Sequence, residues 1–250
     1  MTETKAKTVI QNEPNLETIL LLPGTLCDKL LFESQITNLS DLGKCVVIDT
    51  ATADNLSELA GQILANAPPK FTLLGLSYGG IIAFEILRQA SHRVTKLILL
   101  NTNYKAPSQA TINNQKRFLE MAKRGEFREI TTDNLKDAML HAKHSKKVSI
   151  RNTVLQMALN VGIKGFINQI TAQLNRPDST VDLPTIQCPT LIIAGRQDTI
   201  CPVVLHQEMA NLIPNSTLQI MEDCGHLSTL EQPTTVNQAI KTWWKMTLNE

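Results

Sequence analysis

The sequence predicts an α/β fold in which a mostly parallel sheet is flanked by helices and interrupted by an all-helical insertion. Short apolar runs alternate with helical patterns in residues 1–105 and again in residues 181–250, as is typical of parallel strands joined by helices. Between residues 106 and 180 no strand-like run occurs, and apolar side chains recur at helical spacing instead. We therefore expect a core of residues 1–105 and 181–250 that carries a helical cap, or lid, of residues 106–180.

Six apolar runs predict the strands of this core, and in chain order they are residues 18–22, 45–48, 71–74, 97–100, 190–194 and 217–221. A helical pattern follows the second run, and Asp54 or Asn55 is placed to cap that helix. Further helices are expected after the third run, near residues 203–212, and at the C-terminal end around Trp243. This alternation is the main evidence for the fold class.

Composition excludes several classes of protein. The chain has 250 residues, 42% of them hydrophobic and 19% charged, and its net charge is +1. Such a balance gives no chain-wide attraction to nucleic acid or to anionic membranes. No apolar run approaches the roughly 18–20 residues that span a bilayer, and residues 1–15 lack the apolar segment of a signal peptide. We expect a cytoplasmic protein without a membrane span.

Cysteine usage argues against a disulfide framework or a zinc site. The five cysteines are scattered and contain no CxxC pair; they are Cys27, Cys45, Cys188, Cys201 and Cys224. A disulfide framework or zinc site would require closer spacing or partner histidines. We therefore expect free thiols and no zinc site formed by these cysteines.

The third strand run leads into GLSYGG at residues 75–80, which fits the G-x-S-x-G pattern. In isolation this pattern also occurs in ordinary glycine-rich turns, but here a buried strand precedes it and a helix follows it. On such a turn the hydroxyl of Ser77 projects beyond the sheet, and larger neighbours than glycine would collide with nearby backbone. We predict Ser77 as a catalytic nucleophile.

A serine hydroxyl is a weak nucleophile at neutral pH and requires a positioned base. Among the five histidines, only His226 lies in a loop directly after a late strand, and Gly225 beside it permits an unusual backbone turn. The others lie in or beside helices, and they are His92, His141, His144 and His206. We predict His226 as the base; the alternative is a structural loop histidine.

The base in turn requires a carboxylate, which fixes its tautomer and stabilises the imidazolium. Asp198 follows the fifth strand run, at the carboxyl end of the sheet, where such sites collect. The competing position after the fourth run holds Asn101 and offers no carboxylate, and Asp223 is too close in sequence to His226. Asp198 is therefore predicted as the acid, with a helix N-cap as its alternative role.

A reacting carbonyl also requires two backbone donors for its developing oxyanion. One is expected to be the amide of Tyr78, directly after the nucleophile. The other is expected from the turn after the first strand, where Thr25 is the first choice and Leu26 the second.

Four segments, LLPGTLCD, GLSYGG, CPTLIIAGRQD and DCGHLSTLEQP, together resemble the α/β-hydrolase family. Within it they look most like small carboxylesterases, including the pimeloyl-carrier-protein methyl ester esterase group. The resemblance covers nearly the whole core and implies ester hydrolysis through an acyl-serine, without metal or cofactor. Pro23-Gly24 stands where many members have His-Gly, and residues 8–11 (TVIQ) are expected as a remnant of the hairpin that often opens the fold.

The helical insertion is basic. Residues 116–176 contain 12 Lys or Arg and 5 Asp or Glu, a local charge of +7. This charge is either an ordinary solvated surface or a field that steers an acidic partner, such as an acyl carrier protein or acyl-coenzyme A. By the resemblance, the insertion roofs the acyl pocket, and the residues expected to bind substrate are Leu26, Phe166, Ile170 and Leu227.

These predictions converge on a serine hydrolase that cleaves carboxylic esters of small to medium acyl groups. Thioesterase, lactonase and carbon–carbon hydrolase reactions use the same triad, and the sequence does not separate them because specificity lies in the pocket. A non-catalytic ligand-binding homologue is the alternative from a different class, and the complete set of Ser77, Asp198 and His226 argues against it.

Overall fold

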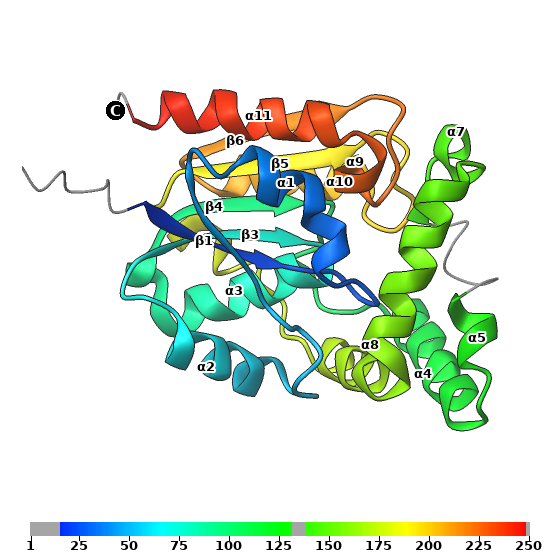
Figure 1. Ribbon diagram of the computed structural model, residues 1–250. Coiled ribbons are helices and arrows are strands. Elements are labelled where there is room, and N and C mark those ends of the chain that lie inside the picture. The colour runs from blue at the N-terminus through cyan, green and yellow to red at the C-terminus, as the bar shows by residue number, and fades with distance from the viewer. Residues whose placement is uncertain (1–15, 132–138, 249–250) are drawn as a thin grey trace, which may run out of the picture.

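The computed structural model describes residues 16–131 and 139–248 (Figure 1). The hairpin remnant expected at residues 8–11 lies outside these residues. One sheet is built from β1 (Glu17–Leu22), β2 (Gly43–Val47), β3 (Phe71–Leu76), β4 (Val94–Leu100), β5 (Thr190–Gly195) and β6 (Ser216–Met221). Its spatial order is β2-β1-β3-β4-β5-β6, and all neighbouring strands are parallel. The predicted fold class is confirmed, and each predicted run overlaps one strand.

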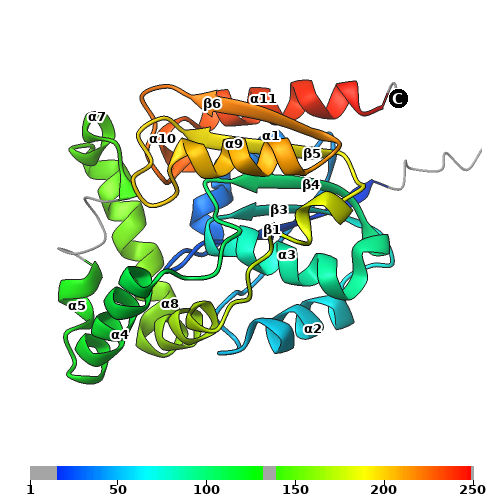
Figure 2. The ribbon, with the colours of Figure 1, turned by 180° about the vertical axis from the view of Figure 1, so that it is seen from behind.

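Helices cover both faces of this sheet (Figures 1 and 2). On one face lie α1 (Glu33–Asn38) and α11 (Pro233–Met246), whose Ile240 and Trp243 pack with strand residues such as Ile98. On the other face lie α2 (Leu56–Asn66), α3 (Tyr78–Ala90) and α9 (Val203–Leu212). The central strands β3 and β5 are consequently buried at every position, which is why they are continuous apolar runs in the sequence.

Short helices complete the connections of the core. They are η1 (Lys29–Phe32), η2 (Ser91–Arg93), η4 (Leu183–Thr185) and α10 (Ser228–Glu231). Of the two residues predicted to cap α2, Asn55 performs this role, because its side chain accepts hydrogen bonds from the amides of Ser57 and Glu58.

The helical insertion, residues 106–180, contains α4 (Gln109–Lys123), α5 (Phe127–Glu129), α7 (Ala142–Ser145) and α8 (Val148–Leu174). These helices lie beyond the carboxyl ends of the strands (Figure 1). Gly162 interrupts α8 with φ 67° and divides it into two helical halves. Where the structure describes the insertion it contains no strand, as expected, while its assignment as a separate cap stays a prediction. Within residues 16–131 and 139–248, no helix is both long and apolar enough to cross a membrane.

Candidate active site

Backbone strain is concentrated at the carboxyl edge of the sheet. In the described part of the chain, four residues other than glycine have positive φ: Leu26, Ser77, Asn101 and Asp223, at 58°, 55°, 45° and 53°. They follow β1, β3, β4 and β6, respectively. Such conformations cost about 1–3 kcal/mol each and persist where the surrounding structure holds them, often at functional sites. This edge is therefore the place to examine for chemistry.

Ser77 lies at the sharp turn between β3 and α3. Its amide donates a hydrogen bond to the carbonyl oxygen of Leu100 at 2.9 Å, and the hydroxyl of Thr102 donates to the carbonyl oxygen of Ser77 at 2.7 Å. A Cβ on Gly79 would collide with the carbonyl oxygen of Leu22, and one on Gly75 would come within 2.5 Å of the Gly79 oxygen. The close approach of α3 to the strands thus requires the glycines of the motif.

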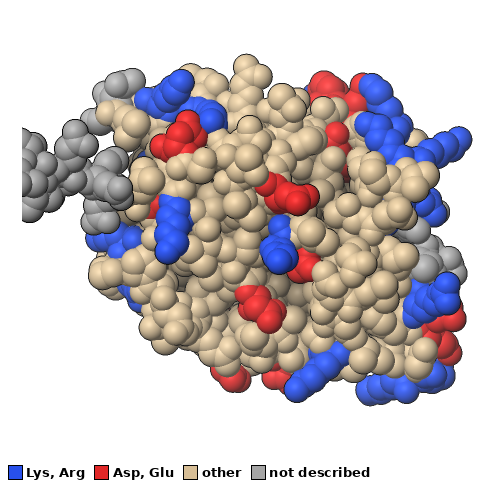
Figure 3. Space-filling model, viewed as in Figure 1, with Lys and Arg blue, Asp and Glu red and all other residues tan. Residues whose placement is uncertain are grey.

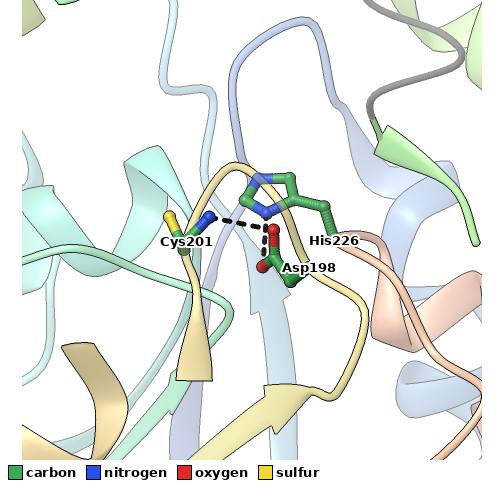
Figure 4. Close-up of side chains that lie close together, drawn as sticks. All are labelled: Asp198, Cys201 and His226. Carbon is green, nitrogen blue, oxygen red and sulfur yellow. Dashed lines mark hydrogen bonds and ion pairs between the residues drawn. The ribbon is translucent and has the colours of Figure 1, made fainter. Parts of the chain in front are cut away.

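Three predicted side chains from separate loops meet here. The Ser77 hydroxyl oxygen lies 2.8 Å from Nε2 of His226, and Nδ1 of His226 lies 2.8 Å from Oδ2 of Asp198. Figure 4 shows the imidazole of His226 above the carboxylate of Asp198. The hydrogen-bond network assigns the Nδ1–H tautomer, because Nδ1 faces the carboxylate, so that Nε2 can accept the serine proton.

The Asp198 carboxylate is buried and fully surrounded by donors. Its Oδ1 accepts hydrogen bonds from the amides of Ile200 and Cys201, both at 2.9 Å. Its Oδ2 accepts from Nδ2 of Asn101 at 3.0 Å, in addition to His226. Burial raises the pKa of Asp198, but the charge and hydrogen bond of His226 and the other donors outweigh burial, so the pKa is lowered overall. The group therefore stays ionised at neutral pH.

Asp198, Cys201 and His226 form the one group in the described residues whose His, Cys and carboxylate atoms converge as metal ligands do, within 4.8 Å (Figure 4). Both ring nitrogens of His226 already face Asp198 and Ser77. Burial, followed by the charge of Asp198, raises the pKa of the Cys201 thiol well above its ordinary value. A protonated thiol is a poor metal ligand, so the arrangement suits proton transfer better than metal coordination.

The loop of residues 23–28 follows β1 and is called here the oxyanion loop. It contains Thr25 and Leu26, the first and second choices for an oxyanion donor. The amide of Leu26 donates to Oε1 of Gln169 at 2.9 Å and is occupied. Among the residues that the structure describes, none accepts a hydrogen bond from the amide of Thr25 or of Tyr78. Their assignment as oxyanion donors stays a prediction, and the bond from the amide of Leu26 to Gln169 favours Thr25 over the second choice.

The residues predicted to bind substrate lie in two apolar clusters. Leu26, in the loop after β1, packs with Phe166 and Ile170 of the insertion, in a cluster that also contains Phe118. Leu227 is buried on the side of the sheet that α11 covers. Their contact with a substrate stays a prediction.

Glu231 is a functional candidate that sequence reasoning missed. Its Oε1 accepts hydrogen bonds from the amides of Gly225 and Leu227, at 3.1 and 3.2 Å, which are the residues on either side of His226. Its Oε2 accepts from the amide of His141 at 2.8 Å and lies 3.1 Å from Nδ1 of His144. This buried carboxylate therefore fixes the histidine loop and ties it to the insertion.

His206 and Asn101 are two further residues whose roles the sequence did not indicate. The amide of Thr102 donates to Nε2 of His206 at 3.0 Å, and Nδ1 faces the carbonyl oxygen of Pro202. Burial lowers the pKa of His206 to about 4, so the ring is neutral at neutral pH. It thereby holds Thr102, whose hydroxyl donates to the carbonyl oxygen of Ser77. Asn101 has one signal in the sequence, which is its position directly after a strand, where a catalytic acid would also be expected.

This strand–turn–helix site on a parallel sheet is matched by a family model for the alpha/beta hydrolase fold over residues 53–233. The match covers most of the chain, which therefore belongs to the alpha/beta hydrolase fold family. The resemblance inferred from the four sequence segments is confirmed.

Particular relatives carry several hydrolase names. The chain is 25% identical to a pimeloyl-[acyl-carrier protein] methyl ester esterase of Photobacterium profundum, over 78% of each protein. It is 27% identical to a 2-hydroxy-6-oxononadienedioate/2-hydroxy-6-oxononatrienedioate hydrolase of Pseudomonas putida, over 74% of this chain and 66% of that protein. Among these and one longer relative, the chain spans from 45% to 78% of the relative's length.

A solved structure agrees with these relatives in fold. The thermophilic esterase from Thermogutta terrifontis, determined with malate bound, superposes with a TM-score of 0.83 at 28% identity. The superposition covers 92% of this chain and 90% of that one.

Proposed function

We propose that the chain is a serine hydrolase that cleaves carboxylic esters of small to medium acyl groups. One observation carries this proposal, namely the continuous hydrogen-bonded series from Ser77 through His226 to Asp198, with both distances at 2.8 Å. A hydroxyl on a strained turn, a base within reach and an ionised buried acid are together what acyl transfer to serine requires.

In the proposed acylation step, Nε2 of His226 takes the proton of Ser77 while the serine oxygen attacks the ester carbonyl carbon. A carbon–oxygen bond forms, and the negative charge that collects on the carbonyl oxygen is stabilised by the amides of Thr25 and Tyr78. Asp198 stabilises the imidazolium. The tetrahedral intermediate then collapses, the ester bond breaks, and the imidazolium donates its proton to the departing alkoxide.

In deacylation, water replaces the alcohol. Nε2 of His226 removes a proton from the water, whose oxygen attacks the acyl carbon of the Ser77 ester. The second tetrahedral intermediate releases the carboxylic acid, and Ser77 recovers its proton from His226. Protons and bonds balance without any group beyond these side chains, the substrate and water.

Relatives named as esterases support the ester as substrate, while other relatives are named for 2-hydroxy-6-oxo-dienedioate hydrolysis. Thioesters, lactones and carbon–carbon bonds, which the same three residues can cleave, remain the competing substrates. A panel of one p-nitrophenyl ester, one acyl-coenzyme A, one lactone and one vinylogous diketone, compared by kcat/KM, separates them. The proposal predicts the highest value for the ester.

The test of the chemistry is turnover of p-nitrophenyl butyrate by the wild type and by Ser77→Ala. Loss of the nucleophile should lower kcat by at least about 10⁴-fold, because residues of a triad act as a unit. A protein that binds butyrate but turns over no member of the panel would instead be a non-catalytic ligand-binding homologue, and the proposal would fail.

An acidic carrier of the acyl group is the partner that the surface favours. Figure 3 shows Lys and Arg side chains along the margin of the molecule that the insertion occupies. Lys146, Lys147 and Lys164 are exposed there and pair with no carboxylate among the described residues. An acyl carrier protein or coenzyme A is negatively charged, so such a surface would accelerate encounter.

This steering is tested by a salt series with carrier-bound and free methyl esters. The double variant Lys146→Glu and Lys147→Glu should lower kcat/KM for the carrier-bound ester only. The control is Lys44→Glu with Lys70→Glu, which makes the same charge change at the amino end of the strands. A preference for the carrier that salt does not weaken would contradict steering.

A further inference from the structure

The C-terminal half of α8 docks directly on the oxyanion loop. Gly165, Gln169 and Gln173 are spaced four residues apart and so lie on one face of this helix. A Cβ on Gly165 would lie 2.9 Å from the Cβ of Ala51, which shows how closely the helix approaches the core there. The same helix face therefore reaches both the loop after β2 and the loop after β1.

Gln169 contacts these two loops through both ends of its amide. Its Oε1 accepts the hydrogen bond from the amide of Leu26 at 2.9 Å, and its Nε2 donates to the hydroxyl of Thr50 at 3.1 Å. Gln169 has no exposed surface, and Thr50 is 2% exposed. In such a buried place a lost partner leaves a polar group without a hydrogen bond, which is costly. The side chain is thus held in one orientation.

Gln173 holds the neighbouring residue of the loop. Its Nε2 donates to the hydroxyl oxygen of Thr25 at 2.9 Å and also to the carbonyl oxygen of Gln169 at 3.0 Å. The two glutamines therefore fix the side chain of Thr25 and the amide of Leu26. The amide of Thr25, the predicted oxyanion donor, directly precedes these two contacts in the chain.

Leu26 shows how the insertion contacts the loop at its most strained residue. The residue has φ 58°, a region that leucine rarely adopts. Its side chain packs in the apolar cluster of the insertion, beside Phe118 and Phe166. Within the loop, the amide of Cys27 donates to the carbonyl oxygen of Gly24 at 3.1 Å and closes a turn around Thr25 and Leu26. Residues more than ninety positions away add to this turn, because they anchor both the side chain and the backbone amide of Leu26.

We infer that Gln169, assisted by Gln173, is a positioning residue that sets the oxyanion loop, so that the donor amide of Thr25 is aligned only when α8 is docked. This inference rests on the proposed function and adds to it. The helical insertion then does more than cover a pocket, because half of the oxyanion site depends on its placement. Gln169 acts through Leu26 and makes no contact with the reacting atoms.

The test compares Gln169→Leu, which removes the acceptor at similar volume, with Gln169→Glu, which keeps an acceptor oxygen. Asn168→Ala is the matched control, since Asn168 lies on the same helix and donates to the carbonyl oxygen of Ala51 at 2.9 Å without touching the oxyanion loop. Each protein is assayed with p-nitrophenyl butyrate, inactivated with diethyl p-nitrophenyl phosphate, and measured for amide exchange in a peptide containing Leu26.

Complete loss of an oxyanion donor lowers kcat by about 10²–10³-fold, so misplacement of one should lower it by about tenfold. We expect this fall in kcat in Gln169→Leu, with a KM within about twofold of the wild type. The rate at which diethyl p-nitrophenyl phosphate phosphorylates Ser77 should fall equally, and the backbone amide of Leu26 should exchange faster. Gln169→Glu should recover most of the rate, and Asn168→Ala should resemble the wild type.

Two results would overturn the inference. One is an active Gln169→Leu with unchanged kcat, and the other is an equal loss in Asn168→Ala, which would indicate general loosening of α8. A wild type that hydrolyses no ester contradicts the proposed function itself, and this is established before any variant is compared.

Discussion

The carboxyl edge of the sheet and the helical insertion contribute to the candidate site in different ways. At the sheet edge, the proposed reacting side chains follow the strands directly and are held by local amides and by neighbouring strand ends. Asp198 accepts hydrogen bonds from amides two and three residues further on, and the amide of Ser77 donates to the carbonyl oxygen of Leu100 on the next strand. The insertion acts across long distances in sequence. Gln169 is 143 positions from Leu26, and Glu231 is 90 from His141.

This difference assigns separate tasks to the two regions. In the proposed reaction, the sheet edge carries the residues assigned as nucleophile, base and acid, while the insertion contacts the loops of the proposed oxyanion donor and base. Substitutions at the sheet edge should therefore abolish the reaction, whereas substitutions at the contacts with the insertion should reduce it or destabilise the fold. The variants below challenge this division in order of expected effect.

Asp198→Asn should have the largest effect. The amide cannot stabilise the imidazolium and favours the wrong tautomer of His226, so kcat should fall by about 10⁴-fold with p-nitrophenyl butyrate. The Asn101 side chain also loses its carboxylate partner. A fall of less than tenfold would mean that another group orients the base, and the assignment of the acid would be wrong.

Glu231→Gln should reduce both rate and stability. The Glu231 carboxylate accepts hydrogen bonds from the amides on both sides of His226 and from the amide of His141 in the insertion. Hydrogen bonds to charged groups contribute about 1.5–3 kcal/mol. We expect a loss of about 2–3 kcal/mol in the free energy of unfolding, measured with urea, and a fall of about tenfold in kcat.

The matched control for this variant is Glu222→Gln. Glu222 directly follows β6, four residues before His226, and pairs with Arg196 in the loop after β5, but its side chain is 67% exposed. Exposed pairs contribute at most about 1 kcal/mol, so the control should change neither quantity appreciably. Equal losses of kcat and of unfolding free energy in both variants would contradict the role of Glu231 in holding the loop of His226.

His206 should make stability depend on pH. Its pKa is lowered by burial from 6.5 to about 4 in the folded chain. Below pH 6.5 the unfolded chain therefore binds the proton first, and stability falls as the pH falls towards 4. The loss should reach about 3 kcal/mol near pH 4. His206→Gln, which keeps an acceptor for Thr102, should flatten this dependence in urea titrations from pH 7 to 4; an unchanged slope would contradict it.

Gly162→Ala should have the smallest effect. The position has φ 67°, and nothing lies within 4 Å of an added Cβ, so only backbone strain of about 1–2 kcal/mol opposes the change. Gly61→Ala, in the middle of α2, has ordinary helical geometry and open space, and should instead stabilise by about 0.5–1 kcal/mol. A lower melting temperature for Gly162→Ala and a higher one for Gly61→Ala would support a break in α8 that requires glycine. Changes of the same sign in both variants would contradict it.

The sequence predicts the sheet well because burial on both faces leaves a visible signature. The runs at β3 and β5 are apolar at nearly every position, and each strand ends where glycine permits a turn. Ser77 was found from this local context, and His226 from its loop after β6. Asp198 was reached by elimination, and the structure places all three within hydrogen-bond distance.

The supporting residues could not be predicted because long-range hydrogen bonds have no periodic pattern. Gln169 lies in a predicted helix and gives no indication that it meets Leu26. Glu231 lies five residues after His226 in sequence without indicating which amides donate to it. Asn101 was excluded because it is not an acid, although its amide is what the buried carboxylate needs. Such partners become evident only when the chain is folded.

The central claim is that Ser77 forms an acyl intermediate with the help of His226 and Asp198. The most direct measurement mixes the enzyme rapidly with p-nitrophenyl acetate, quenches with acid and locates the acetyl group by peptide mass spectrometry. We predict a burst of p-nitrophenol equal to the enzyme concentration and an adduct on Ser77, both absent in Ser77→Ala. An undiminished burst in that variant, or an adduct confined to another residue, would contradict the account.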